Sequence, residues 1–134
     1  MLTASCRATS IADRLGTGFA LIHKERPRPG VVGRMVLVGD VQDKISIVVD
    51  DIADTSGTLA KAAEVLKQHG AREVIAIVTH GVLSGDAVNT INNSHLTSVV
   101  VTNTVSFALA LPYTLDHSRD GADSILSLTL GAPR

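Results

Sequence analysis

The sequence predicts an α/β domain with a mostly parallel sheet and flanking helices. Short apolar runs rich in β-branched residues recur between residues 45 and 103. They alternate with helical patterns, the clearest of which places apolar residues at i, i+3, i+4 and i+7 over residues 59–66. Glycines and polar residues separate these segments. Strands that alternate with helices favour parallel pairing, because each helix returns the chain to the same end of the sheet.

The segments before residue 45 alternate less regularly. Residues 9–15 predict the end of a helix, which Gly16 terminates. Residues 19–22 predict a short buried strand, and residues 35–38 predict a second strand. Between them, residues 23–34 predict a loop, because prolines and glycines interrupt any regular pattern.

The central segments are the best defined. Residues 45–49 are nearly all apolar, which predicts a strand covered on both faces. The helix that follows ends near Gly70, the usual position of a left-handed cap. Residues 74–78 predict another buried strand, residues 87–91 a short helix and residues 99–101 a further strand. In the last part of the chain, residues 125–130 are compatible with one more strand or with a docked helix.

Composition narrows the class of function. A chain of 134 residues fits one compact domain. Its formal net charge of -1 and aromatic content of 2% argue against a nucleic-acid interface. A single cysteine, Cys6, excludes an internal disulfide and fits a reducing compartment, so we expect a cytoplasmic protein. We expect neither a signal peptide nor a membrane span.

The most informative segment is the acidic run that follows residues 45–49. Asp50 and Asp51 end the predicted strand, and Asp54 precedes the small, hydroxyl-rich loop Thr55-Ser56-Gly57-Thr58. This loop opens the predicted helix, where free N–H groups and the helix dipole attract phosphate. The acids lie at the carboxyl end of a strand, where open α/β sheets bind ligands, and can hold hydroxyls or a divalent cation. The run therefore predicts a sugar phosphate site.

The same motifs allow other interpretations. A Walker A loop is excluded because no lysine follows Gly57, and a dinucleotide fingerprint because only one glycine is present there. The plain alternative is a polar turn with an N-capped helix. Lys24, Arg26 and Arg28 form a second motif, whose loop can close over a phosphate; a solvated basic turn is its alternative. We expect His80, at a strand end, to hydrogen-bond the backbone.

Taken together, the motifs resemble those of the ribose-phosphate pyrophosphokinase family, also called phosphoribosyl pyrophosphate synthetases, over its C-terminal half. The matching stretches are TSIADRL from Thr9, ALIHKER from Ala20, RMVLVGDV from Arg34, VDDIADTSGT from Val49, THGVLSG from Thr79, INNS from Ile91 and VVVTNT from Val99. The resemblance implies a type I phosphoribosyltransferase fold. It also divides the chain into a phosphoribosyltransferase-like domain, residues 1–104, and a divergent tail, residues 105–134.

The resemblance implies an activity and roles for the site residues. Members of this family transfer a pyrophosphoryl group from ATP to the 1-hydroxyl of ribose 5-phosphate, with Mg²⁺. Lys24 and Arg26 match the catalytic cations, and Arg26 also binds substrate. Asp50 and Asp51 lie near the ribose hydroxyls and the Mg²⁺. The 5-phosphate cradle consists of Asp54, Thr55, Ser56, Gly57 and Thr58.

The resemblance also implies an assembly, either a homo-oligomer or association with other synthetase subunits. Since the family's N-terminal half supplies much of the ATP site, it further implies a truncated form that lacks this half. Two alternatives remain open. In the first, the chain is a non-catalytic, regulatory partner of the synthetase. In the second, it is a phosphoribosyltransferase that modifies a base.

Overall fold

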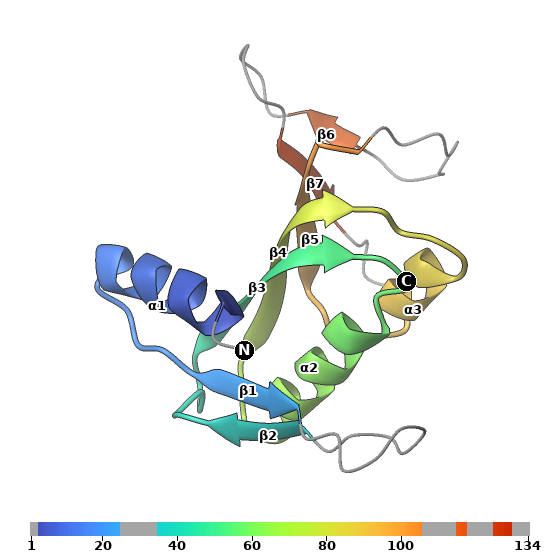
Figure 1. Ribbon diagram of the computed structural model, residues 1–134. Coiled ribbons are helices and arrows are strands. Elements are labelled where there is room, and N and C mark those ends of the chain that lie inside the picture. The colour runs from blue at the N-terminus through green and yellow to red at the C-terminus, as the bar shows by residue number, and fades with distance from the viewer. Residues whose placement is uncertain (1–2, 25–34, 106–114, 118–124, 130–134) are drawn as a thin grey trace.

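The structure is a computed structural model, and it describes residues 3–24, 35–105, 115–117 and 125–129 (Figure 1). In chain order the elements are α1 (Thr3–Leu15), β1 (Leu21–Lys24), β2 (Met35–Val38), β3 (Ile45–Ala53), α2 (Gly57–Gln68), β4 (Glu73–Gly81), α3 (Ala87–Asn92), β5 (Ser98–Thr102), β6 (Leu115–His117) and β7 (Ile125–Thr129).

The main sheet has the strand order β3-β4-β5-β7-β6. β3, β4 and β5 run parallel, as predicted, with Val49 beside Ile77 and Ile77 beside Val100. β7 is antiparallel to β5, and β6 is antiparallel to β7. The predicted α/β fold is thus confirmed, and of the two structures considered for residues 125–130, the strand is the one formed.

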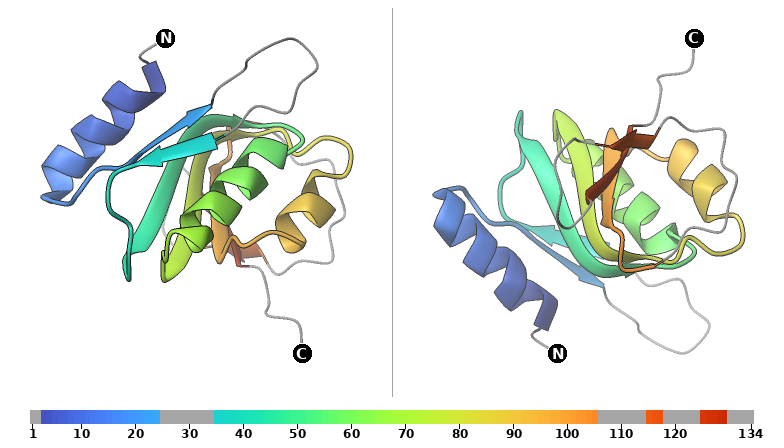
Figure 2. Two further views of the ribbon diagram at one scale, coloured as in Figure 1. Left: turned by 90° about the horizontal axis from the view of Figure 1, so that it is seen from below. Right: turned by 90° about the horizontal axis from the view of Figure 1, so that it is seen from above.

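Helices α2 and α3 lie side by side over one face of the parallel strands (Figure 2). The side chains beneath them form the core, and Val74, Val78, Val99 and Val101 are its largest fully buried members. Leu59 packs into the same core from the predicted helical stripe of α2. The amphipathic pattern predicted α2 because its period of 3.6 places these residues on one face.

The opposite face of the parallel strands corrects the prediction that β3 is covered on both faces. Ile45 is 46% exposed and Ile47 is 51% exposed in β3, and Ile77 is 41% exposed in β4. Successive residues of a strand point to opposite faces, so these side chains point away from α2 and α3. In the described part of the chain, α1 packs beside β3 at the end of the molecule opposite α3 (Figure 2). An apolar strand sequence alone does not show whether one face or both are covered.

β1 and β2 form a separate antiparallel pair, with Leu21 opposite Val38 and Lys24 opposite Met35. Residues 35–38 were predicted correctly, but the predicted strand at residues 19–22 has the wrong bounds. Phe19 lies before β1, because pairing with β2 begins only at Leu21. Its side chain is 41% exposed. The predicted loop of residues 23–34 is wrong at its start, since His23 and Lys24 belong to β1, and residues 25–34 lie outside the described residues.

The helix ends and the shorter elements agree with the sequence patterns. Gly16 and Gly70 follow α1 and α2 with φ of 62° and 85°, the left-handed conformation predicted for helix ends. α3 and β5 form where a short helix and a strand were predicted. None of the helices in the described ranges has the length and apolar character needed to span a bilayer.

Candidate functional site

β3 and β4 are parallel, so their carboxyl ends lie at the same end of the sheet. The loop from β3 leads directly into α2 (Figure 1). The first backbone bond of α2 runs from Ala60 N–H to Ser56 O at 3.0 Å. The N–H groups of Gly57, Thr58 and Leu59 therefore precede the first closed turn, where an α-helix leaves donors without intrahelical acceptors. Twelve residues of helix align their dipoles behind these groups.

The space in front of this helix end is open. Thr55, Gly57 and Thr58 are exposed, and a Cβ placed on Gly57 would meet nothing within 4 Å. An anion can therefore approach the backbone at Gly57 closely, which a side chain there would hinder. We call residues 54–58 the phosphate loop.

Ser56 is the strained residue of the phosphate loop. Its φ of 62° and ψ of 5° are left-handed, a conformation that costs a residue with a side chain about 1–2 kcal/mol. Ser56 is 4% exposed, and within the described residues its hydroxyl has no hydrogen-bond partner. Because the hydroxyl is covered, any contribution of Ser56 to an anion comes from its backbone. Strain of this kind at a helix entry is typical of binding sites.

Replacing Ser56 with glycine is expected to raise the free energy of unfolding by about 1 kcal/mol. Glycine removes the left-handed strain and the buried hydroxyl, which has no partner among the described residues, and these gains exceed its larger loss of backbone entropy. Urea denaturation followed by circular dichroism measures the change, with Ser94→Gly as a control at a serine that is not left-handed. An equal or lower stability of Ser56→Gly would contradict the strain.

Asp54 is tied to the neighbouring loop between β4 and α3. The Ser84 hydroxyl donates to Asp54 Oδ1, and Ser84 N–H donates to Asp54 O at 3.1 Å. Leu83 N–H donates to Ala53 O at 3.0 Å, so two successive amides hold the same strand end. Sequence reasoning missed Ser84 as a site residue, although it lies in the motif THGVLSG. Ser84 lies near Asp54 because β3 and β4 are parallel and end at the same end of the sheet.

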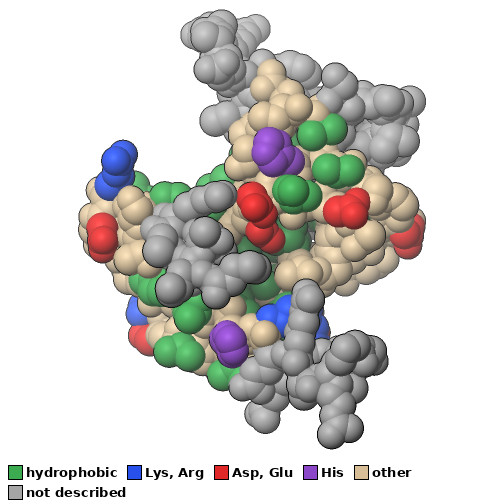
Figure 3. Space-filling view, viewed as in Figure 1, with side chains coloured by type: hydrophobic (Ala, Val, Ile, Leu, Met, Phe, Trp, Pro, Cys, Tyr) green, Lys and Arg blue, Asp and Glu red, His purple; other side chains and the backbone are tan. Residues whose placement is uncertain are grey.

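Asp50 and Asp51 interact with each other within β3, which continues to Ala53 and so extends beyond the predicted strand of residues 45–49. Asp51 N–H donates to Asp50 Oδ1 at 2.9 Å. Burial raises the pKa of Asp50 above its ordinary value of 3.8, and the neighbouring Asp51 carboxyl raises it further, against the lowering effect of that hydrogen bond. Figure 3 shows acidic side chains over this part of the sheet, beside a histidine and apolar side chains.

Two carboxyl groups are too few to enclose a metal ion with protein ligands alone, but they suit Mg²⁺, which keeps other ligands. No group of three or more His, Cys, Asp or Glu side chains suited to a metal occurs in the described part of the chain. Mg²⁺ commonly takes one or two carboxylates and completes its shell with water and substrate phosphates. A cation would also offset the cost of a half-buried charge at Asp50.

Replacing Asp50 with asparagine is expected to stabilise the chain at neutral pH. The raised pKa means that the folded chain binds more protons than the unfolded chain between pH 3.8 and the folded pKa. The free energy of unfolding therefore falls as pH rises through this window and stays lower above it. Asp50→Asn removes this fall. Chemical denaturation at several pH values checks it, with Asp13→Asn on α1 as control; an unchanged pH profile would contradict the burial argument.

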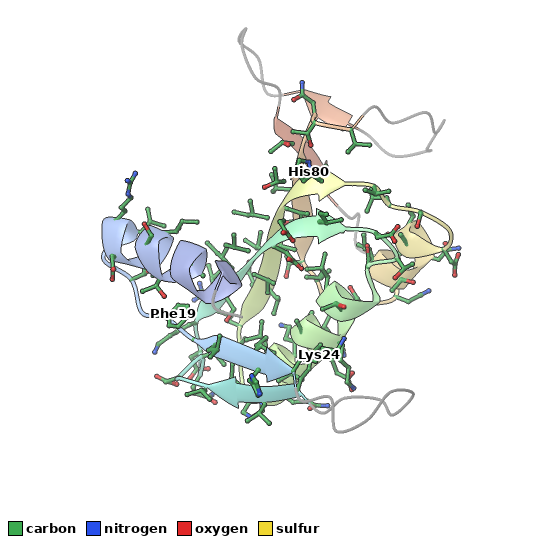
Figure 4. All side chains as sticks on the ribbon, viewed as in Figure 1. Phe19, Lys24 and His80 are labelled. Carbon is green, nitrogen blue, oxygen red and sulfur yellow. The ribbon has the colours of Figure 1, made fainter. Side chains whose placement is uncertain are left out.

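The cations of the second motif are placed only in part. Lys24 ends β1 with an exposed side chain, and it makes no ion pair with a described carboxylate (Figure 4). Arg26 and Arg28 lie outside the described residues. Of the predicted site residues, the structure thus places Asp50, Asp51 and residues 54–58 in one segment, and Lys24 on a separate hairpin.

His80 corrects the expectation of a backbone partner. Its Nδ1 lies 2.8 Å from Thr104 Oγ1, so its partner is a side chain of the segment after β5 (Figure 4). The Thr104 hydroxyl in turn donates to Thr79 O at 2.9 Å, and Thr102 Oγ1 donates to the same carbonyl at 2.6 Å. The pairing of β4 with β5 brings these side chains together, which the local sequence does not reveal.

Comparison with known proteins adds to this geometry. Residues 28–111 match the family model described as "Phosphoribosyl synthetase-associated domain", and this match includes the whole phosphate loop. The chain is 68% identical over 101 residues to ribose-phosphate pyrophosphokinase 3 of Saccharomyces cerevisiae, covering 75% of this chain and 32% of the yeast protein. It is 58% identical over 130 residues to ribose-phosphate pyrophosphokinase 1 of Candida albicans, covering 93% of this chain and 40% of that protein.

A solved structure has a similar fold over three quarters of this chain. The phosphoribosylpyrophosphate synthetase of Mycobacterium smegmatis superimposes with a TM-score of 0.67 and 40% sequence identity, covering 75% of this chain and 32% of that chain. The chain thus spans between about a third and two fifths of the length of these relatives.

Proposed function

Because the chain belongs to the phosphoribosyl synthetase family, with ribose-phosphate pyrophosphokinases as its relatives, we propose that it carries the ribose 5-phosphate site of such an enzyme. In the proposed reaction, ATP and ribose 5-phosphate form phosphoribosyl pyrophosphate and AMP. The observation that carries the proposal is the open N-terminus of α2, which follows the two carboxyl groups near the end of β3 by a short loop. One end of this segment suits a phosphate and the other suits sugar hydroxyls.

In the proposed complex, the 5-phosphate accepts hydrogen bonds from the first amides of α2. The hydroxyls of Thr55 and Thr58 are exposed and available to the same phosphate, whereas the Ser56 hydroxyl is covered. Asp50 and Asp51 then accept hydrogen bonds from the ribose hydroxyls. Several weak contacts at both ends of the sugar fix its 1-hydroxyl, and such positioning supplies much of the acceleration in phosphoryl-type transfers.

The chemical step is a pyrophosphoryl transfer. The 1-hydroxyl oxygen attacks the β-phosphorus of ATP, and the bond from that phosphorus to the oxygen bridging to the α-phosphate breaks. AMP leaves with that oxygen and its electron pair, while the proton of the hydroxyl is released to solvent. Lys24 and Arg26 are proposed to neutralise negative charge on the transferring group, as cations at such sites do. Mg²⁺, held by Asp50 and Asp51 directly or through water, would supply further neutralisation of the phosphates.

The whole activity requires more than the described site. Since the chain spans between about a third and two fifths of its relatives, we propose that an ATP site is completed by further synthetase sequence, in a homo-oligomer or with other synthetase subunits. The reducing environment favoured by a single cysteine fits a cytoplasmic location for this assembly. A non-catalytic partner of the synthetase is the second candidate, because the chain matches a domain described as synthetase-associated.

Product analysis tests the proposal against its alternatives. The chain is incubated with ATP, ribose 5-phosphate and Mg²⁺, alone and together with a full-length synthetase. Release of AMP that depends on ribose 5-phosphate and increases with the amount of chain supports the proposal. Pyrophosphate release that depends on an added base would instead show a base phosphoribosyltransferase. Stable binding to the full-length enzyme without any added turnover would show a non-catalytic partner.

A further inference from the structure

We infer that Ser84 is a positioning residue for the phosphate loop, and that it acts through Asp54. This inference rests on the proposed function, since it assigns a role within the same ribose 5-phosphate site. Ser84 lies 30 positions after Asp54 in the sequence, yet it contacts this residue through both its backbone and its side chain.

The contact has the geometry of a clamp between two loops. Ser84 N–H donates to the Asp54 carbonyl at 3.1 Å, and the Ser84 hydroxyl donates to the Asp54 carboxylate. One step earlier, Leu83 N–H donates to Ala53 O at 3.0 Å. Leu83 itself is 2% exposed, so its buried side chain anchors the loop that carries Ser84 in the core. The clamp thus connects the start of the phosphate loop to the hydrophobic core.

Charge explains why Asp54 needs a positioning partner. A carboxylate repels a phosphate, so an acid beside an anion site is costly unless hydrogen-bond donors occupy its oxygens. The Ser84 hydroxyl is such a donor, and a hydrogen bond to a charged group is stronger than one between neutral groups. With Oδ1 directed to Ser84, Asp54 fixes the backbone before Thr55 and leaves the amides of α2 facing the ligand. Ser84 therefore acts on the backbone that binds the phosphate without contacting the phosphate itself.

The test compares three variants of the full chain. Ser84→Ala removes the hydroxyl, Ser84→Thr keeps it, and Asn89→Ala removes a similar exposed bond, from Asn89 Nδ2 to Asp86 Oδ1, that does not involve the phosphate loop. Two quantities are measured for each: the Kd for ribose 5-phosphate by titration calorimetry, and, without ligand, amide hydrogen exchange at positions 83 and 84, whose N–H groups donate to Ala53 O and Asp54 O. Thermal unfolding by circular dichroism confirms that each variant folds.

Ser84→Ala is expected to weaken ribose 5-phosphate binding by about 10- to 100-fold, as the loss of a hydrogen bond to a charged group predicts, and to speed exchange at positions 83 and 84. Ser84→Thr and Asn89→Ala should remain near wild type in both measurements. Wild-type affinity and exchange in Ser84→Ala would overturn the clamp while leaving the proposed function intact. If Ser84→Ala fails to fold, weak binding by a folded Ser84→Thr would overturn the role of the hydroxyl. A wild-type chain that binds no ribose 5-phosphate would contradict the proposed function, and the positioning role with it.

Discussion

Replacing Asp54 with alanine is expected to weaken ribose 5-phosphate binding about 100-fold, to the point where calorimetry detects little or no heat. The substitution removes the acceptor of the Ser84 hydroxyl, and with it the bond that fixes the start of the phosphate loop. A hydrogen bond to a charged group contributes about 1.5–3 kcal/mol, and the upper end of this range corresponds to about 100-fold in Kd. The loss arises from disorder of the amides that open α2, and the measurement is a calorimetric titration with ribose 5-phosphate.

Asp54→Asn is the matched control for this experiment. Asparagine keeps an oxygen that accepts from Ser84 but removes the negative charge, so we expect binding within about tenfold of wild type. An equal, large loss in both variants would show that the charge matters and not the hydrogen bond. Unchanged affinity in Asp54→Ala would reject the proposed arrangement of the phosphate loop altogether.

Replacing Lys24 with alanine is expected to reduce turnover by about 10²–10³-fold while changing the KM for ribose 5-phosphate only a few-fold. In the proposed mechanism Lys24 meets charge that develops on the transferring group, so its contribution is larger in the transition state than in the bound ground state. Its exposed position at the end of β1 and the absence of an ion pair with a described carboxylate leave its charge available. The measurement requires a full-length synthetase that carries this chain's sequence over the matched region.

Lys44→Ala controls for the general loss of a surface cation. Lys44 is exposed and pairs with Asp40 at 2.6 Å, and it belongs to no part of the proposed site. Its removal is expected to leave both kinetic constants near wild type, since exposed ion pairs contribute little. If Lys24→Ala behaves like this control, Lys24 has no catalytic role.

Local sequence patterns predicted those elements whose signals are contained within a single segment. The helical period of α2, the glycine after it and the short apolar runs of β4 and β5 each depend on a few neighbouring residues. Their order along the chain was sufficient to predict parallel pairing, since a helix between two strands returns the chain to the same end of the sheet.

Features that depend on distant residues were predicted less well. Ile47 and Ile77 lie in apolar strand segments, which favour burial, yet both side chains are about half exposed. They point away from α2, and no described helix covers that face of the sheet in the way that α2 covers the opposite face. The bounds of β1 were wrong because its partner β2, and not its own apolarity, decides where it begins.

The same distinction holds within the site. The phosphate loop was predicted from its own residues and lies where expected, at the N-terminus of α2. Ser84 and the partner of His80 were not found, because their contacts bridge 30 and 24 positions of sequence. The buried side chain of Ser56 was not predicted either, because burial depends on the surrounding fold and not on the loop's own residues.

The first amides of α2 are proposed to bind the phosphate of a sugar phosphate. Nuclear magnetic resonance of the amide-labelled chain tests it most directly, with ribose 5-phosphate titrated in the presence of Mg²⁺ and ribose titrated as the comparison. We expect the amide signals of Gly57, Thr58 and Leu59 to shift in a saturable way with ribose 5-phosphate and to remain in place with ribose. Signals that do not move with ribose 5-phosphate, or that move equally with ribose, would contradict it.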